Sequence, residues 1–309
     1  MPSQKKLVSF GIAAYIALSP MHLEAAKPEK GHNPNVVSYK KGRYIPISYK
    51  GVKIHSFLAN LGMHKGKVAS DVCPHLPELK PGEPNELIFL PSGKILENIV
   101  AEYESSSGRN VLAAINGSYF DPETYHVIGR EVVDGRLIKR KTIKPSSSGF
   151  KISELKRYER KFSDYDFKNR ASFFVDDNDK PKIGYFNYIG DAKYFLTAGS
   201  MLVFDSKNVW ENSYETEQFD KAYLKPYRRS AVAITKRDDL LLVAAEKITI
   251  EVLTEFLMRL GVKSAMSLDS GSSVQLVLDK VYDKNEKEKK DFLIYGTKRK
   301  IVNGILVVE

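Results

Sequence analysis

The sequence predicts an α+β fold, a single domain in which a mixed β-sheet is packed by a few helices. Three observations lead to this prediction. Short apolar runs of strand character recur from residue 51 to the C-terminus, apolar residues recur at helical spacing in two segments, and no strand–helix unit repeats along the chain. Strands and helices mixed without a repeat are typical of the α+β class. The 309 residues, 42% of them hydrophobic, are enough for one large core or two small ones.

The first two thirds of the chain are expected to hold one helix and several turns. Apolar side chains at helical spacing follow Ser92, which we expect to cap the helix, and the helix is expected to end before Gly108. Asp134-Gly135 between two apolar pairs is typical of a hairpin turn. The basic and aromatic segment 144–166 is expected to be an inserted loop or lid. The expected strands of this part are residues 52–58, 111–115, 171–175, 182–186 and 200–204.

The last third of the chain is more strongly patterned. Apolar residues recur at intervals of three and four before Gly261, which places one apolar face on a helix that stops at this glycine. The residues of this face are Ile250, Leu253, Leu257 and Leu260. The expected strands around the helix are residues 230–234, 240–245, 264–268, 274–278 and 301–308.

The N-terminus has the features of a secretory signal peptide. Lys5 and Lys6 precede the apolar run 7–18, which is too short to span a bilayer because a spanning helix needs about 20 apolar residues. We expect cleavage near Ala26 and a secreted or periplasmic mature chain without an integral membrane span; an uncleaved N-terminal anchor is the alternative. The expected organisation is a signal peptide at residues 1–26, a flexible lead-in at 27–46 and a folded domain at 47–309.

Charge and cysteine content exclude several classes of function. The 48 Lys and Arg against 38 Asp and Glu give a net charge of +10, with both signs interspersed along the chain. This balance suits an anionic ligand, but no basic helix or zinc-finger spacing accompanies it, so we expect no nucleic acid partner. The single cysteine, Cys73, cannot form an internal disulfide, and with His64 and His75 it does not complete a metal-ligand set. We therefore expect no metal and no cofactor.

The first candidate segment for chemistry, residues 116–121, ends an expected strand in a polar turn. Asn116 offers hydrogen-bond donors and an acceptor, Tyr119 offers an aromatic wall for a sugar ring, and Asp121 offers a carboxylate. A turn in which Asn116 and Gly117 adopt left-handed backbone explains the same residues without any function.

The second and third segments add a cation and a carboxylate. Arg229 opens an expected strand, where a guanidinium suits bidentate phosphate binding, although arginines at strand starts usually lie on the surface. Asp269 ends the strand 264–268 and is followed by small residues, which leave space beside the acid and present backbone N–H groups to an anion. A serine-rich turn is the alternative for this segment.

In this order the three segments resemble motifs of the phosphodiester glycosidase family. Residues 116–120 match an Asn-Gly-Gly-Phe-Phe type segment, and residues 229–231 match an Arg-Thr-Ala type strand. Residues 268–273 match a Leu-Asp-Gly-Gly-Gly-Ser type loop in which Ser270 and Ser272 replace glycines.

Two further segments, 197–203 and 299–305, also look like family segments, so the resemblance runs from about Gly51 to Glu309. It implies a hydrolase whose partner is a carbohydrate or glycosyl-phosphate substrate, a glycosyl phosphodiester or a related linkage in an envelope or extracellular glycan. One departure concerns residues 244–249, which stand where family members usually have an Asp-Gly-Arg turn and a glycine-bearing loop. We expect a shortened substrate-facing loop there.

The chemistry of glycoside cleavage suggests roles for these residues. Hydrolysis at an anomeric carbon develops oxocarbenium character, which a carboxylate stabilises, usually together with a second acid. We assign Asp269 as the leading carboxylate and leave Asp121 and Glu131 open as the second acid or base. Arg229 is assigned as the phosphate clamp and Asn116 as the group that positions a sugar or water. The other expected substrate contacts are Gly117, Tyr119, Gly271, Ser272 and Ser273.

Two other classes of protein remain open. The loop 268–273 also resembles the hydrophobic-Asp-Thr-Gly-Ser loop of aspartic proteases, but a pepsin-like chain needs two copies and only Asp269-Ser270-Gly271 occurs here. A glycan-binding protein that kept the fold and lost turnover would retain the same residues.

Overall fold

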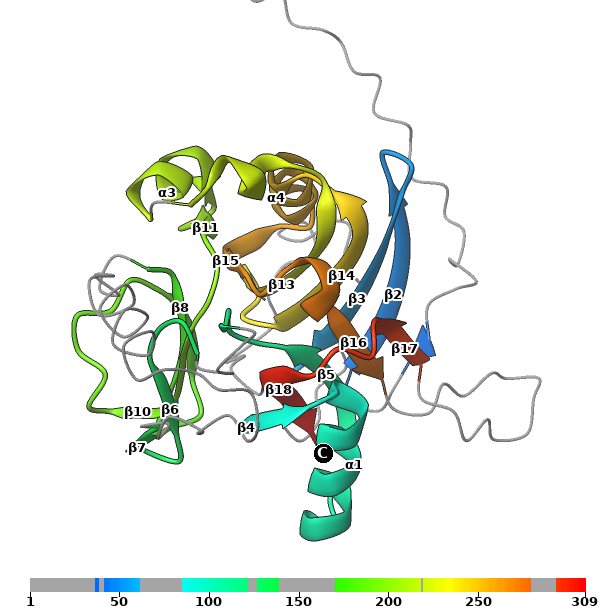
Figure 1. Ribbon diagram of the computed structural model, residues 1–309, viewed down its shortest axis with the longest axis vertical. Coiled ribbons are helices and arrows are strands. Elements are labelled where there is room, and N and C mark those ends of the chain that lie inside the picture. Colours follow the sequence, from blue (N-terminus) through cyan, green and yellow to red (C-terminus); the bar gives the residue numbers. More distant parts are fainter. Residues whose placement is uncertain are drawn as a thin grey trace, which may run out of the picture. The chain divides into compact units, whose positions relative to one another are not determined.

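The computed structural model describes residues 37–38, 42–61, 85–121, 127–138, 170–217, 219–278 and 293–309, all within the compact unit Asn35–Glu309. It confirms the α+β class, with strands in three sheets and a few helices (Figure 1). The predicted signal peptide, the predicted insertion 144–166 and Cys73 lie outside the described residues. The lead-in prediction is wrong for residues 42–46, which belong to a strand and bury Tyr44 and Ile45.

The largest sheet has eight strands. In spatial order these are β1 (Val37–Ser38), β2 (Gly42–Tyr49), β3 (Val52–Ala59), β14 (Leu240–Ile248), β13 (Tyr227–Thr235), β15 (Val262–Ser267), β11 (Met201–Phe204) and β12 (Lys207–Asn208). Both faces of its centre are buried. Leu241 and Val243 pack with the helices on one face, whereas Leu240 and Leu242 pack toward the two other sheets. Because successive strand residues point to opposite faces, this two-sided burial explains the uninterrupted apolar run of β14.

The two smaller sheets have five strands each. One contains β7 (Arg136–Leu137), β6 (Glu131–Val133), β10 (Ala192–Thr197), β8 (Ser172–Asp176) and β9 (Pro181–Gly184). The other contains β17 (Leu293–Gly296), β16 (Gln275–Leu278), β5 (Val111–Asn116), β18 (Ile301–Val308) and β4 (Glu86–Lys94). The predicted Asp134-Gly135 turn joins β6 to β7, and both residues have positive φ, 49° and 72°.

The prediction of a mixed sheet is wrong, because every pairing between the described strands is antiparallel. Helix α4 (Ile250–Arg259) connects β14 to β15, a crossover that would give a parallel pair if the two strands were neighbours. Strand β13 lies between them and is antiparallel to both. The insertion of this one strand turns a potential parallel pair into two antiparallel ones.

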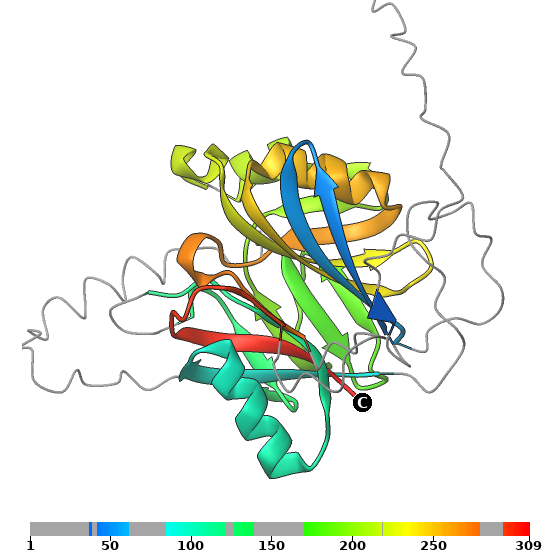
Figure 2. The ribbon, with the colours of Figure 1, turned by 90° about the vertical axis from the view of Figure 1, so that its right-hand side faces the viewer.

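Three α-helices occur in the described part of the chain. Helices α3 (Trp210–Thr216) and α4 cover one face of the eight-stranded sheet (Figures 1 and 2). Thr249 caps α4 by accepting a hydrogen bond from the Val252 N–H at 3.3 Å. Helix α1 (Leu96–Ser107) ends at Gly108 as predicted, but Ser92 lies in β4 and does not cap it. None of the helices described is both long and apolar enough to cross a bilayer.

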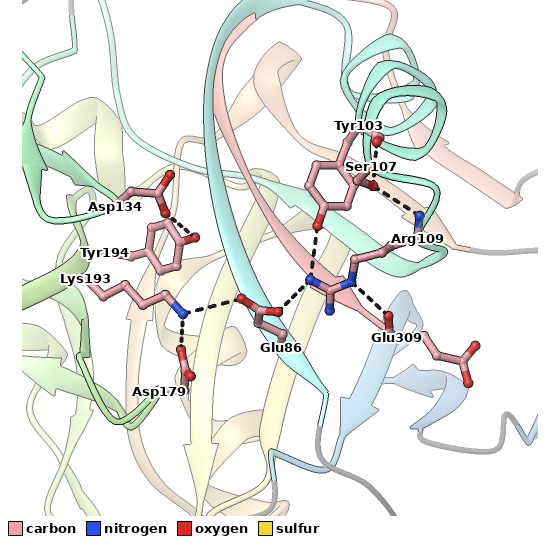
Figure 3. Close-up of polar contacts among 9 residues, drawn as sticks. All are labelled: Glu86, Tyr103, Ser107, Arg109, Asp134, Asp179, Lys193, Tyr194 and Glu309. Atoms are coloured by element: carbon pink, nitrogen blue, oxygen red, sulfur yellow. Dashed lines mark hydrogen bonds and ion pairs between the residues drawn. The ribbon is translucent and has the colours of Figure 1, made fainter.

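A polar network joins the two five-stranded sheets (Figure 3). Glu86 on β4 accepts from Arg109 at 2.6 Å and pairs with Lys193 on β10 at 3.4 Å, and Lys193 also pairs with Asp179 at 2.6 Å. Burial opposes ionisation of Glu86, but the two cations outweigh it and lower the pKa of this carboxyl. Arg109 precedes β5, whereas Asn116 ends it about 20 Å further along the strand. The network therefore supports the sheets and stays apart from the candidate site.

Candidate active site

The structure brings the three predicted segments together at the backbone of Asp269. The Asp269 carbonyl accepts hydrogen bonds from Asn116 Nδ2 at 2.8 Å and from Ser230 Oγ at 2.9 Å. Its N–H donates to the Gly117 carbonyl at 3.0 Å. The ends of β5 and β15 and the start of β13 thus meet at one residue, and the position of the Asp269 carboxyl depends on all three strands.

Asn116 orders this junction instead of facing a ligand. It is 1% exposed, and its Oδ1 accepts from the Gln275 N–H at 3.1 Å while its Nδ2 is bonded to Asp269. Both polar ends of the amide are therefore occupied by backbone groups. This placement differs from the predicted role of positioning a sugar or water, because the amide completes the hydrogen bonding of two strand ends.

Gly117 is required by close packing and not by a left-handed backbone. Its φ is not positive, but a Cβ at this position would lie 2.3 Å from Oδ1 of Asn303 on β18. The Gly117 N–H donates to the Asn303 carbonyl at 3.1 Å. A side chain here would displace the Asn303 amide, which accepts from the Ser118 N–H and donates to Glu131.

The Asp269 carboxyl is a buried acid whose proton affinity is raised. The residue is 8% exposed, and its Oδ1 accepts from the Ser270 N–H at 2.8 Å. Burial raises its pKa to about 7, while the Ser273 hydroxyl, the Ser270 N–H and the charge of Arg299 act in the opposite direction. A pKa near neutrality suits a group that takes part in general acid–base or electrostatic catalysis.

The loop after Asp269 supplies small residues with different surroundings. Gly271 has φ +68° and open space around it, whereas Ser272 is exposed and Ser273 is completely buried. Ser273 Oγ forms no hydrogen bond of regular geometry with any described residue, although it lies close enough to lower the pKa of Asp269. The loop is therefore open on the side of Gly271 and Ser272.

Arg229 lies deeper than predicted. It is 1% exposed, and its Nη2 donates to the carbonyls of Tyr223 and Lys225, the latter at 2.8 Å. Its Nη1 approaches Ser270 Oγ at 3.4 Å. No carboxylate of the described residues pairs with it, so its positive charge lies next to the Asp269 loop without an ion-pair partner among these residues. The structure therefore does not place Arg229 as an exposed phosphate-binding side chain at the start of the strand.

Aromatic side chains border the site. Tyr119 O–H lies 3.3 Å from Ser270 Oγ, and burial raises the pKa of this phenol well above its ordinary value. The Tyr119 ring packs on Phe219 with 6.3 Å between the ring centroids, and Phe219 stacks on Tyr223 with 4.4 Å between theirs. Tyr119 therefore lies beside the loop as a neutral aromatic side chain, and its contact with a sugar ring stays a prediction.

The two candidate second acids occupy different places. Asp121 is buried immediately after Phe120. Glu131 on β6 is also buried, and its Oε1 accepts from Asn303 Nδ2 at 2.9 Å. Asn303 Oδ1 in turn accepts from the Ser118 N–H at 2.8 Å. Glu131 is therefore connected to the Asp269 junction through Asn303, and the choice between the two acids stays a prediction.

Sequence reasoning missed Arg299 and Glu217. Arg299 precedes β18, and its guanidinium lies over the Phe120 ring, with Cζ 5.0 Å from the ring centroid. Glu217 is a buried carboxyl whose pKa burial raises to about 7, although it accepts from the N–H groups of Ala171 at 3.0 Å and Met201 at 2.9 Å. The family-like segment 299–305 was a signal for Arg299, but no periodicity or motif distinguishes Glu217.

Two other features complete the description of the site. Residues 244–248 continue strand β14, and Thr249 caps α4 directly, so the strand passes to the helix without an intervening loop. Across the described ranges, no three His, Cys, Asp or Glu side chains form a group that could hold a metal ion.

Comparison of the sequence with known protein families identifies the family of this chain. The sequence profile of the phosphodiester glycosidase family matches residues 109–308, which is more than half of the chain and includes Asp269, Arg229 and Arg299. The chain therefore belongs to the phosphodiester glycosidase family, a family of hydrolytic glycosidases. A search of curated protein sequences gives no match.

Two solved structures share the fold. One is the catalytic domain of zebrafish N-acetylglucosamine-1-phosphodiester alpha-N-acetylglucosaminidase, auto-inhibited by its pro-peptide, with 16% identity and a TM-score of 0.54 over 87% of this chain and 82% of that one. The other is a hypothetical protein from Synechocystis, with 13% identity and a TM-score of 0.57 over 87% of this chain and 62% of that one. At these identities the likeness concerns the fold alone.

Proposed function

We propose that this chain hydrolyses a glycosyl phosphodiester, or a closely related glycosidic linkage, in an envelope or extracellular glycan. The observation that carries the proposal is the surroundings of Asp269. This buried acid, with a pKa of about 7, is bordered by Arg229 and Arg299, and neither guanidinium pairs with a carboxylate of the described residues. Family membership and the name of the zebrafish enzyme support a phosphodiester as the substrate class.

The proposed reaction breaks the bond between the anomeric carbon and the phosphate oxygen. The electron pair of this bond leaves with the phosphate, which departs as a phosphomonoester anion and needs little protonation. Ionised Asp269 opposes the positive charge that develops on the sugar, either through space or by bonding to the anomeric carbon. A water molecule then forms the new C–O bond; where Asp269 has bonded to the carbon, that bond breaks and its electron pair returns to the carboxylate. The proton of the water passes to a second carboxylate, for which Asp121 and Glu131 are the candidates.

The proposal predicts release of free sugar from a glycosyl phosphodiester by the purified protein. A suitable pair of substrates is the methyl phosphodiester of N-acetylglucosamine 1-phosphate and the neutral methyl glycoside of the same sugar, tested beside envelope polysaccharides. We expect turnover of the phosphodiester or of a polysaccharide carrying such linkages, and at least about 100-fold less by an Asp269→Asn variant prepared in the same way. Ligand binding without product from any of them would instead indicate a glycan-binding protein.

We also propose that the chain is exported, because Lys5, Lys6 and the apolar run 7–18 have the arrangement of a signal peptide. N-terminal sequencing of the native protein is expected to find a mature chain that begins near Lys27, in the periplasm or the medium. An intact Met1 on protein from the cytosol would contradict export.

A further inference from the structure

The two guanidinium groups beside Asp269 differ in what they can still bind. The Arg229 guanidinium is enclosed by other residues. Its Nη2 donates to two backbone carbonyls, and the ring centroids of Tyr223 and Tyr227 lie 4.6 and 5.8 Å from its Cζ. With 1% of its surface exposed, it cannot take a bidentate phosphate without displacing Ser270 or an aromatic ring. Arg229 therefore provides a positive charge and holds Ser270, but offers no open face.

Arg299 combines a free donor face with a fixed position. It is half-buried, its Nη1 donates to Ser272 Oγ at 2.7 Å, and no described residue accepts from its remaining guanidinium N–H groups. Its backbone is fixed as well, since its carbonyl accepts from Gln275 Nε2 at 2.7 Å. A planar guanidinium held over Phe120 in this way presents N–H groups in the geometry that phosphate oxygens accept bidentately.

Arg299 also belongs to the same site as the acid. Its hydrogen-bond partner Ser272 lies three residues after Asp269, on the open side of the loop. Its aromatic support, Phe120, follows Tyr119, whose hydroxyl contacts Ser270. Arg299 is thus linked to the loop that carries Asp269, and it lies close enough for its charge to lower the pKa of the acid. Such proximity is required when a sugar carbon and its phosphate bind together.

We propose that Arg299, through the guanidinium face left open beside Ser272, directly binds the phosphate group of the substrate and determines specificity for phosphodiesters over neutral glycosides. The inference rests on the proposed function and names the residue that recognises the anionic half of the substrate. Arg229 acts on the same phosphate through its positive charge, without a direct contact.

The test measures binding of inorganic phosphate by titration calorimetry, which requires no turnover. The variants are Arg299→Gln, which removes the charge, and Arg299→Lys, which keeps the charge and loses the planar fork. Lys298→Gln and Lys300→Gln are matched controls, because they remove the same charge from exposed neighbours on the same segment. Unfolding midpoints of all variants verify that each binds as a folded protein.

We expect Arg299→Gln to weaken phosphate binding by about 10- to 100-fold, as for the loss of a charge-assisted pair. Arg299→Lys should lie between this variant and the wild type, and both controls should stay within about twofold of the wild type. Equal phosphate binding by the wild type and Arg299→Gln, or equal losses in the Lys298 and Lys300 controls, would overturn the inference. Absence of hydrolysis with intact Arg299-dependent phosphate binding would overturn the proposed function alone.

Discussion

Replacement of Asp269 by asparagine is expected to lower turnover by at least about 100-fold and to raise the free energy of unfolding at pH 8. The substitution keeps the side-chain volume and can still accept the hydrogen bond from the Ser270 N–H. It removes the negative charge that should oppose the developing oxocarbenium ion. It also removes a charge that burial disfavours, which should stabilise the fold. Lost turnover together with gained stability would indicate a catalytic role, whereas a purely structural role predicts a loss of stability.

The pH dependence of this gain in stability follows from the pKa of Asp269. The carboxyl has a pKa of about 7 in the folded chain and an ordinary value of 3.8. Between these values the folded state holds a proton that the unfolded state has released, so this group lowers stability as pH rises and its effect is complete above pH 7. The variant should therefore exceed the wild type by a few kcal/mol at pH 8 and match it near pH 4.

Denaturant unfolding at pH 4, 6 and 8, together with turnover at each pH, tests both expectations. Glu217 has a similar pKa but is present in both proteins, so its contribution cancels in the difference. Near-normal turnover in a well-folded Asp269→Asn protein would refute the catalytic assignment. A less stable variant at pH 8 would show that the carboxylate is needed for packing.

The same measurements on Asp121→Asn and Glu131→Gln distinguish the candidate second acids. The partner acid should lose activity about as severely as Asp269→Asn. Glu131→Gln should chiefly affect stability if Glu131 serves only to orient Asn303, whose side chain holds the Ser118 N–H.

Replacement of Arg229 by methionine is expected to reduce hydrolysis of a phosphodiester by about 100-fold and to destabilise the fold. The carbonyls of Tyr223 and Lys225 would lose their donor, which costs about 1–3 kcal/mol per buried group left unpaired. The positive charge beside the Asp269 loop would disappear as well, and an anionic substrate should suffer more from that loss than a neutral one.

Arg229→Lys serves as the matched variant, because a lysine keeps the charge but cannot reproduce the planar fork. We expect it to recover part of the phosphodiester activity and less of the stability. Kinetics on the phosphodiester and on the neutral glycoside, with unfolding midpoints for both variants, provide the comparison. Equal losses on the two substrates would show that Arg229 only maintains the structure.

Several elements of the fold could be predicted from local pattern. The helix at residues 250–259, the strand that precedes Asp269 and the Asp134-Gly135 turn all appear where periodicity and turn chemistry place them. Strand β10 and helix α3 were not predicted, because their apolar residues are mixed with charged ones and their burial comes from distant segments. The prediction of a mixed sheet was wrong for a related reason, since local sequence does not reveal that β13 lies between β14 and β15.

The sequence by itself determined which residue types stand at the ends of buried strands, and so identified Asp269, its small neighbours and the Asn116-Gly117 turn. Only the tertiary structure decided which polar atoms remain open to a ligand. Asn116 and Asp269 are 153 positions apart, yet one hydrogen bond between them occupies the amide that the sequence assigned to substrate. The same holds for the two arginines. The carbonyls of Tyr223 and Lys225 occupy Arg229, whereas Arg299 keeps N–H groups that no described residue accepts. The direction of a long side chain depends on partners that it meets only in the folded chain.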